Sequence, residues 1–217
     1  MSEKKYAVIL SGSGYLDGSE IRESVLTFLA LDTQKIAYDI FAPNIDQHHT
    51  LNHLTSNESD QTRNVLEESA RIARSNISDL VKIDTSTYDG LVIPGGFGVA
   101  KNLCSFAFDG LEAKVNETVN RVVLDFHASS KPITAICIAP ALVALCIKGA
   151  KLTLGAKSDA SAAIESFGSE HVEASSSEFV VDEKNKIVST PAYMHEDASL
   201  DEIYKGISGA IEAQTRL

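Results

Sequence analysis

The sequence contains no tryptophan and only three cysteines, two methionines and five prolines among its 217 residues. Three cysteines spread from position 104 to position 146 are too few for a disulfide framework or a zinc site. No apolar run reaches the roughly 18 residues that a membrane helix needs. The N-terminus passes at once into an apolar segment and lacks the features of a signal peptide. We therefore expect a soluble, reduced, cytoplasmic protein without a metal.

Basic residues are also scarce, because 19 Lys and Arg stand against 30 Asp and Glu and give a formal net charge of −11. An acidic surface repels phosphate groups, which argues against nucleic acid and anionic membranes as partners. The content of 44% hydrophobic and 23% charged residues is typical of a globular protein. No linker, repeat or low-complexity block interrupts the chain, so we expect one domain over residues 1–217.

Segments typical of strands alternate along the chain with segments of helical periodicity. Strands are expected at 6–11, 36–42, 91–93, 132–137 and 152–154, with a hairpin at 178–190. Helices are expected at 21–29, 61–75, 115–126, 140–147, 160–167 and 200–211, the first from the spacing of Ile21, Val25, Phe28 and Leu29. This alternation predicts an α/β fold with a mostly parallel sheet covered on both faces. Ligands of such sheets bind beyond the carboxyl ends of the strands.

Cys137 is the candidate nucleophile. It follows the apolar run 133–136 directly, and Pro140 begins the next predicted helix. A sharp strand-to-helix turn is a nucleophile elbow, which exposes the side chain and directs helix N–H groups at it. Such surroundings favour the thiolate. The alternative is that Cys137 is a small buried hydrophobic residue, the role we expect for Cys146 and, in the core or at the surface, for Cys104.

Two glycine-rich turns also follow predicted strands. One turn contains Gly95 and Gly96, which can let backbone N–H groups converge on an oxyanion, although most Gly-Gly pairs are ordinary tight turns. The second turn has glycines at positions 12, 14 and 18, close to a dinucleotide-binding pattern. The following strand, however, ends without the acidic residue that binds a ribose.

Glu20 and His195 are the acid–base candidates. Glu20 opens the first predicted helix, where it can serve the helix dipole or face Cys137 and move a proton. His195 can pair with the cysteine or lie on a surface loop. His48, His49 and His53 match no metal-ligand spacing and are expected in a solvated loop.

Five segments together resemble one known family. They are VILSGSGYLDGSEIRE, TRNVLEESARIAR, IPGGFGVAKNL, ICIAPAL and VSTPAYM, in this order, and they extend from residue 6 to about residue 194. The chain is similar to the ElbB family, the isoprenoid biosynthesis proteins with an amidotransferase-like domain of the PfpI-like superfamily. The resemblance implies a flavodoxin-like three-layer sandwich, a class I glutamine amidotransferase-like domain and a homodimer.

By motif position, the resemblance assigns the nucleophile to Cys137, its acidic partner to Glu20 and the oxyanion N–H groups to Gly96 and Ile138. Ile138 stands where true amidotransferases and many PfpI-type peptidases have a histidine, so neither activity is expected. The resemblance implies a cofactor-independent glyoxalase that converts glyoxal or methylglyoxal into a 2-hydroxy acid through a hemithioacetal. The competing interpretation is a non-catalytic redox sensor or a partner-binding regulator of a stress or isoprenoid pathway.

Overall fold

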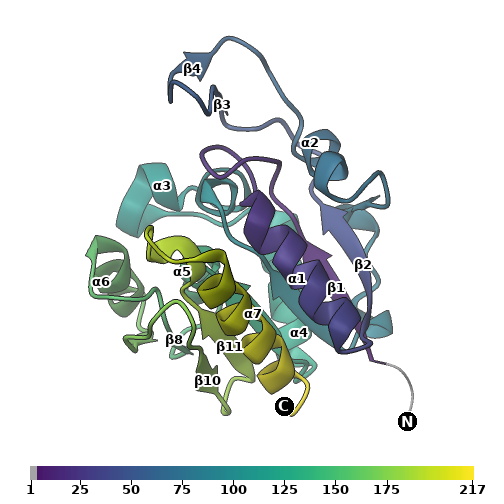
Figure 1. Cartoon of the computed structure of the whole chain (residues 1–217), viewed down its shortest axis with the longest axis vertical. Helices are drawn as coiled ribbons and strands as arrows, with labels where there is room; N and C mark the ends of the chain where they lie inside the picture. Colours follow the sequence, from purple (N-terminus) through teal and green to yellow (C-terminus); the bar gives the residue numbers. More distant parts are fainter. Residues whose placement is uncertain (1–3) are drawn as a thin grey trace.

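The computed structural model describes residues 4–217 and centres on a seven-stranded sheet of order β10-β11-β7-β6-β1-β2-β5 (Figure 1). Its strands are β1 (Lys5–Ile9), β2 (Ala37–Ala42), β5 (Ser78–Asp79), β6 (Gly90–Ile93), β7 (Ile133–Ile136), β10 (Val180–Asp182) and β11 (Ile187–Thr190). All pairs are parallel except β10 with β11. β1, β6 and β7 are buried on both faces, as the centre of a parallel sheet requires.

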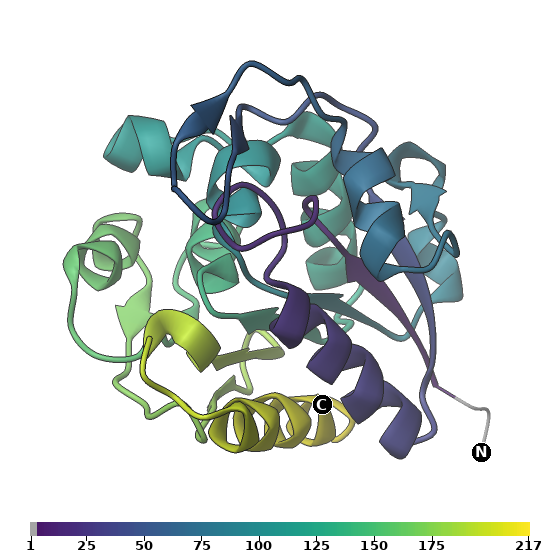
Figure 2. The ribbon, with the colours of Figure 1, turned by 45° about the horizontal axis from the view of Figure 1, so that its top comes forward.

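Helices cover both faces of this sheet. α1 (Ile21–Thr33) and α7 (Leu200–Gln214) lie side by side on one face (Figure 1). α4 (Glu117–Ala128) and α5 (Ala139–Cys146) contact each other on the opposite face (Figure 2). The fold is therefore the predicted flavodoxin-like α/β sandwich. No helix within residues 4–217 is long and apolar enough to cross a membrane.

Each segment predicted from the sequence contains an element of the predicted kind. The remaining expected elements are α2 (Val65–Ile72), β8 (Lys151–Leu152) and α6 (Asp159–Ser166). Elements that the sequence did not predict are all short: β3 (Thr50–Leu51), β4 (Glu58–Ser59), α3 (Phe106–Asp109), β9 (Glu170–His171), the edge strand β5, the π-helical turn η3 (Val99–Leu103) and the 3-10 turns η1 (Leu80–Lys82), η2 (Thr85–Thr87), η4 (Gly110–Glu112) and η5 (Ala192–Met194). Strands of two residues carry too little periodicity to be recognised.

The spacing of apolar residues predicts α1 correctly, but it does not mark the buried side of that helix. Ile21, Val25 and Leu29 lie on the outer face and are 47%, 49% and 47% exposed. The inward face carries Leu26 and, one turn closer to the N-terminus, Glu23, which is fully buried. A carboxyl group therefore faces the protein interior beyond the carboxyl end of β1.

Candidate functional site

Cys137 lies on the predicted elbow between β7 and α5. Its φ of +60° is in the left-handed region, which non-glycine residues adopt at an energetic cost. The backbone N–H of Cys137 donates to the Thr190 carbonyl oxygen at 2.9 Å and so fixes the elbow to the end of β11. The residue is only 8% exposed, and the first turn of α5 begins immediately after it.

Two backbone N–H groups converge on the sulfur of Cys137. They belong to Gly96, in the turn after β6, and to Ile138, the N-cap residue of α5. Both hydrogen bonds stabilise negative charge at the sulfur and so act to lower the pKa of the thiol. The two donors expected from the sequence are thus next to the expected nucleophile.

The carboxyl group beside Cys137 belongs to Glu23, not to Glu20. The Glu23 side chain is hydrogen-bonded to the thiol. Its Oε2 atom accepts the N–H of Gly95 at 3.0 Å, and its Oε1 atom accepts the N–H of Tyr193 at 3.2 Å. The N–H of Gly95 is therefore engaged by Glu23 and orients the carboxyl, instead of facing an oxyanion as expected.

Gly95 is the position that lets these two side chains meet. A Cβ atom there would collide with the Cys137 Cβ and with Glu23 Oε2. A side chain at this position would therefore push the thiol and the carboxyl apart. Both glycines of the expected pair lie next to Cys137, with Gly95 donating to the Glu23 carboxyl and Gly96 donating to the sulfur.

Burial and the nearby Glu20 raise the pKa of Glu23 to about 8. Burial and the Glu23 carboxylate also raise the pKa of the Cys137 thiol above its ordinary value, against the lowering expected from the elbow alone. The two groups titrate as a pair, and the form with both ionised is strongly disfavoured. At neutral pH the pair therefore carries at most one negative charge, on the sulfur or on the carboxyl.

Glu20 occupies the N-cap of α1, and its Oε2 atom accepts the N–H of Glu23 at 2.6 Å. This contact is the helix-capping alternative considered for Glu20. Burial raises the pKa of Glu20, and its charge in turn contributes to the raised pKa of Glu23. The structure thus places the Glu20 carboxyl at the backbone of Glu23. Glu23, not Glu20, occupies the position beside the thiol that was expected for Glu20.

The two glycine-rich turns interlock backbone to backbone. Gly98 N–H donates to the Gly18 carbonyl at 2.9 Å, and a Cβ on Gly18, Gly96 or Gly98 would collide with main-chain atoms. In the turn after β1, the N–H groups of Gly12, Gly14 and Gly18 donate to Ser69 Oγ, the Ser19 carbonyl and the Gly14 carbonyl respectively. None of these three N–H groups is free for a phosphate, which rules against the dinucleotide interpretation.

The remaining candidates lie apart from the thiol. His195 Nε2 is 2.9 Å from the Ala174 carbonyl oxygen, so its ring is engaged elsewhere. Cys104 is buried and Cys146 is half-buried, and burial raises their pKa values to about 11 and about 12. Two of the three loop histidines are exposed, and His49 is half-buried beside Lys101. Within residues 4–217, no group of three or more His, Cys, Asp or Glu is placed to hold a metal ion.

Several known proteins are similar to this chain in sequence or in structure. The family model described as DJ-1/PfpI family matches residues 73–197. The human protein named glutamine amidotransferase-like class 1 domain-containing protein 3, mitochondrial, is 41% identical over 95% of this chain and 81% of its own length. The crystal structure of an isoprenoid biosynthesis protein with an amidotransferase-like domain from Ehrlichia chaffeensis is 39% identical, with a TM-score of 0.91 over 98% of this chain and 99% of that one. Glyoxalase III from Candida albicans shares the fold alone, at 14% identity and a TM-score of 0.61 over 97% of each chain.

Substitution of Glu23 should change the titration of the thiol. In Glu23→Gln the amide cannot carry the charge that opposes ionisation of Cys137, so the thiol pKa should fall. The rate of iodoacetamide alkylation between pH 6 and 10, with peptide mapping to Cys137, measures this pKa. Glu20→Gln is the matched control, because glutamine can still cap the helix and the residue is one step removed from the sulfur. An equal shift in both variants, or none in Glu23→Gln, would contradict the assignment.

The buried Glu23 carboxyl should also make stability depend on pH. Its folded-state pKa of about 8 lies above the ordinary value of 4.5, so between these pH values the unfolded chain has lost the proton and the folded chain has kept it. Folding stability should therefore fall by about 1 kcal/mol per pH unit over this window. The free energy of unfolding, measured by urea titration, should no longer show this decrease with pH in Glu23→Gln. In the control Glu183→Gln, at an exposed site, the decrease should be the same as in wild type. A difference between wild type and Glu23→Gln that is constant from pH 5 to 8 would refute this.

Proposed function

The chain belongs to the DJ-1/PfpI family, and we propose that it converts glyoxal or methylglyoxal into the corresponding 2-hydroxy acid at Cys137 without a cofactor. One observation carries the proposal. A thiol, a carboxyl with a pKa near neutrality and two converging N–H groups meet at the end of one strand. These are the groups that addition to an aldehyde and a proton transfer between two neighbouring carbons require.

The first step uses the form of the pair with a thiolate and a protonated Glu23. The sulfur attacks the aldehyde carbon, a C–S bond forms, and the carbonyl electron pair moves to oxygen. The N–H groups of Gly96 and Ile138, which face the sulfur in the free protein, would then donate to this oxygen. Glu23 gives it a proton, which leaves a hemithioacetal and a carboxylate.

The second step moves hydrogen between the two substrate carbons. The Glu23 carboxylate takes the proton from the carbon bonded to sulfur and gives it to the second carbonyl oxygen, which makes an enediol. Glu23 then takes the hydroxyl proton from the sulfur-bearing carbon and gives it to the second carbon, which makes a thioester. Water adds to the thioester carbonyl, the C–S bond breaks, and the thiol is restored. One carbon is oxidised as its neighbour is reduced, so the sum is addition of one water with no external electron acceptor. Glycolate leaves from glyoxal, and lactate from methylglyoxal.

The enclosure of the site favours a small substrate. Cys137 and Ile138 are each 8% exposed, and Glu23 is fully buried. The interlocked glycine turns hold one wall of the site through backbone contacts that side-chain rotation cannot relax. Aldehydes of two or three carbon atoms can reach such an enclosed thiol more easily than a peptide bond or a glutamine side chain can.

Turnover of glyoxal and methylglyoxal by purified protein tests the proposal. Cys137→Ser should abolish turnover, and Glu23→Gln should lower kcat by about 10²-fold or more, the usual scale for a general acid–base residue. Glu20→Gln should stay within a few-fold of wild type, since Glu20 caps α1 and acts on Glu23 through its charge, without touching the thiol. Activity should persist in EDTA and without added glutathione or nicotinamide. A loss equal in Glu20→Gln and Glu23→Gln, or no saturable turnover by wild type, would overturn the proposal.

A second candidate function, a redox sensor, is favoured by the same N–H groups. Because the Gly96 and Ile138 amides point at the sulfur, they also stabilise negative charge on the oxygen atoms of an oxidised cysteine. Stoichiometric oxidation of Cys137 by peroxide in a protein that does not turn over aldehydes would favour this role over catalysis.

We retain the cytoplasm as a proposed location. All three cysteines are free, which is typical of reducing compartments. The human relative carries a mitochondrial location in its name, so fractionation of cells that express the full-length protein is the direct comparison.

A further inference from the structure

The edge strand β5 leaves part of β2 without a neighbour. β2 pairs with β1 from Ala37 to Phe41, whereas in the described part of the chain β5 pairs only with Phe41 and Ala42. Residues 37–40 therefore have a strand on one side only. The Ala37 N–H donates to the Lys4 carbonyl at 3.0 Å, on the β1 side, so by alternation the backbone groups of Tyr38 and Ile40 point outward.

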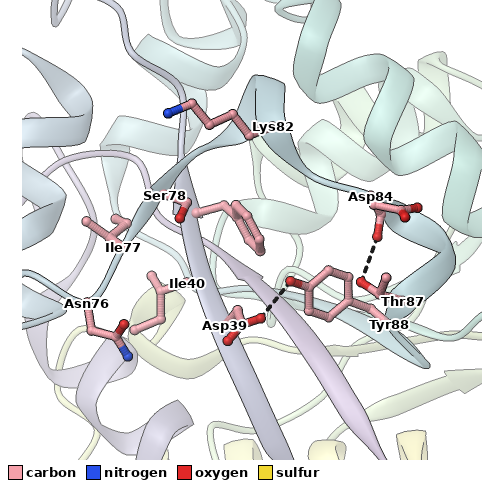
Figure 3. Close-up of a pocket in the computed structure, with 10 residues that line it drawn as sticks. Asp39, Ile40, Asn76, Ile77, Ser78, Lys82, Asp84, Thr87 and Tyr88 are labelled. Atoms are coloured by element: carbon pink, nitrogen blue, oxygen red, sulfur yellow. Dashed lines mark hydrogen bonds between the residues drawn. The ribbon is translucent and has the colours of Figure 1, made fainter.

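A cavity lies on each side of this open edge. The first, of about 340 Å³, is lined by Asp39, Phe41 and Tyr88, on the face that α4 covers (Figure 3). The second, of about 440 Å³, is lined by Phe28 of α1 and Tyr38, whose rings stack at 5.4 Å on the opposite face. Ile40 and Asn76 line both cavities, so the two meet at the edge of the strand.

The two cavities differ in chemistry. The α1-side cavity is mainly apolar, with Phe28, Ile36 and Ile72 among its walls. The α4-side cavity contains Asp39 and Asp84, and hydrogen bonds to each carboxylate hold its pKa below the ordinary value.

Asp39 already pairs with Lys5 at 2.6 Å and accepts the Tyr88 hydroxyl at 2.7 Å. The ammonium of Lys82, which also lines this cavity, points away from Asp39 and Tyr88 (Figure 3). Lys131 lies near Asp84 but donates to the Thr85 and Ser86 carbonyl oxygens. The cavity therefore has mixed charge, with Asp39 and Asp84 as the groups that a basic side chain would meet.

We propose that the open edge of β2 binds an extended peptide that adds a strand beside residues 37–40. Successive side chains of a strand point to opposite faces, so one side chain would enter each cavity. The partner segment has alternating basic and large apolar residues, the basic ones toward Asp39 and Asp84 and the apolar ones toward Phe28 and Tyr38. The net charge of −11 favours approach of a basic partner. This surface is independent of the thiol site.

Binding of the fluorescein-labelled hexapeptide TKFKFT, followed by fluorescence anisotropy, tests the proposal. Its isomer TKKFFT has the same composition and charge but presents one Lys and one Phe to each face. It should bind at least about tenfold more weakly, since one Phe then faces the carboxylates and one Lys faces the apolar cavity. Hydrogen exchange should slow at residues 37–40 when TKFKFT is bound. Cys137→Ser should bind TKFKFT as wild type does, which separates this surface from the proposed function.

Backbone methylation of the peptide tests strand pairing directly. Methylation of both Phe nitrogens blocks antiparallel pairing with Tyr38 and Ile40, and methylation of both Lys nitrogens blocks parallel pairing. One of these two peptides should lose about tenfold or more in affinity, because it loses two hydrogen bonds. Equal binding by both methylated peptides and the unmodified one would overturn the proposal, as would equal binding of TKKFFT.

A protein variant tests the acidic cavity. Asp84→Asn removes the charge and keeps an oxygen that can cap η2 through the Ser86 N–H. TKFKFT should bind this variant about two- to fivefold more weakly, the scale of an exposed ion pair. Glu183→Gln makes the same charge change on the hairpin at the opposite edge of the sheet and should leave the affinity unchanged. An equal loss in both variants would mean that only net charge attracts the peptide.

Discussion

A carboxyl group and a thiol group are buried side by side in this protein, and burial and mutual repulsion strongly disfavour ionisation of both at once. The surrounding elements satisfy that constraint. The turns after β6 and β11 each give one N–H to the Glu23 carboxyl, and the elbow turns the thiol toward it with a positive φ. The absence of a side chain at Gly95 provides the space. The interlocked glycine turns hold the turn after β6, which carries Gly95 and Gly96, against the turn after β1.

The sequence predicts the sheet and most of its helices because long apolar segments of period two or near 3.6 report burial directly. Cys137, Gly96 and Ile138 are likewise placed next to each other as predicted, since residues that follow parallel strands must meet at one edge of the sheet. What these local patterns do not encode is the rotation of a helix about its own axis. In α1 the apolar residues on both sides of the helix leave that rotation ambiguous.

That ambiguity explains why Glu20 was expected at the thiol. Ile21, Val25 and Leu29 form a convincing apolar stripe but lie outside, while Leu26 and Ala30 point inward. Counting back from Leu26 by three residues gives Glu23, so the signal for the acid was its helical spacing to the inward stripe. The edge strand β5, two residues long, was missed for a different reason: no period can be read from it. Because the sequence does not predict β5, it does not predict the open edge of β2 either.

The central claim is that Glu23 keeps its proton at neutral pH because burial and the neighbouring Glu20 disfavour its charge. A carbon-13 NMR titration of the Glu23 side-chain carboxyl, assigned by its loss in Glu23→Gln, measures this most directly. The account predicts a midpoint near pH 8 in wild type and a lower midpoint in Glu20→Gln, because the repelling charge of Glu20 is then absent. A carboxyl that is already ionised at pH 5 in the folded wild-type protein would contradict it.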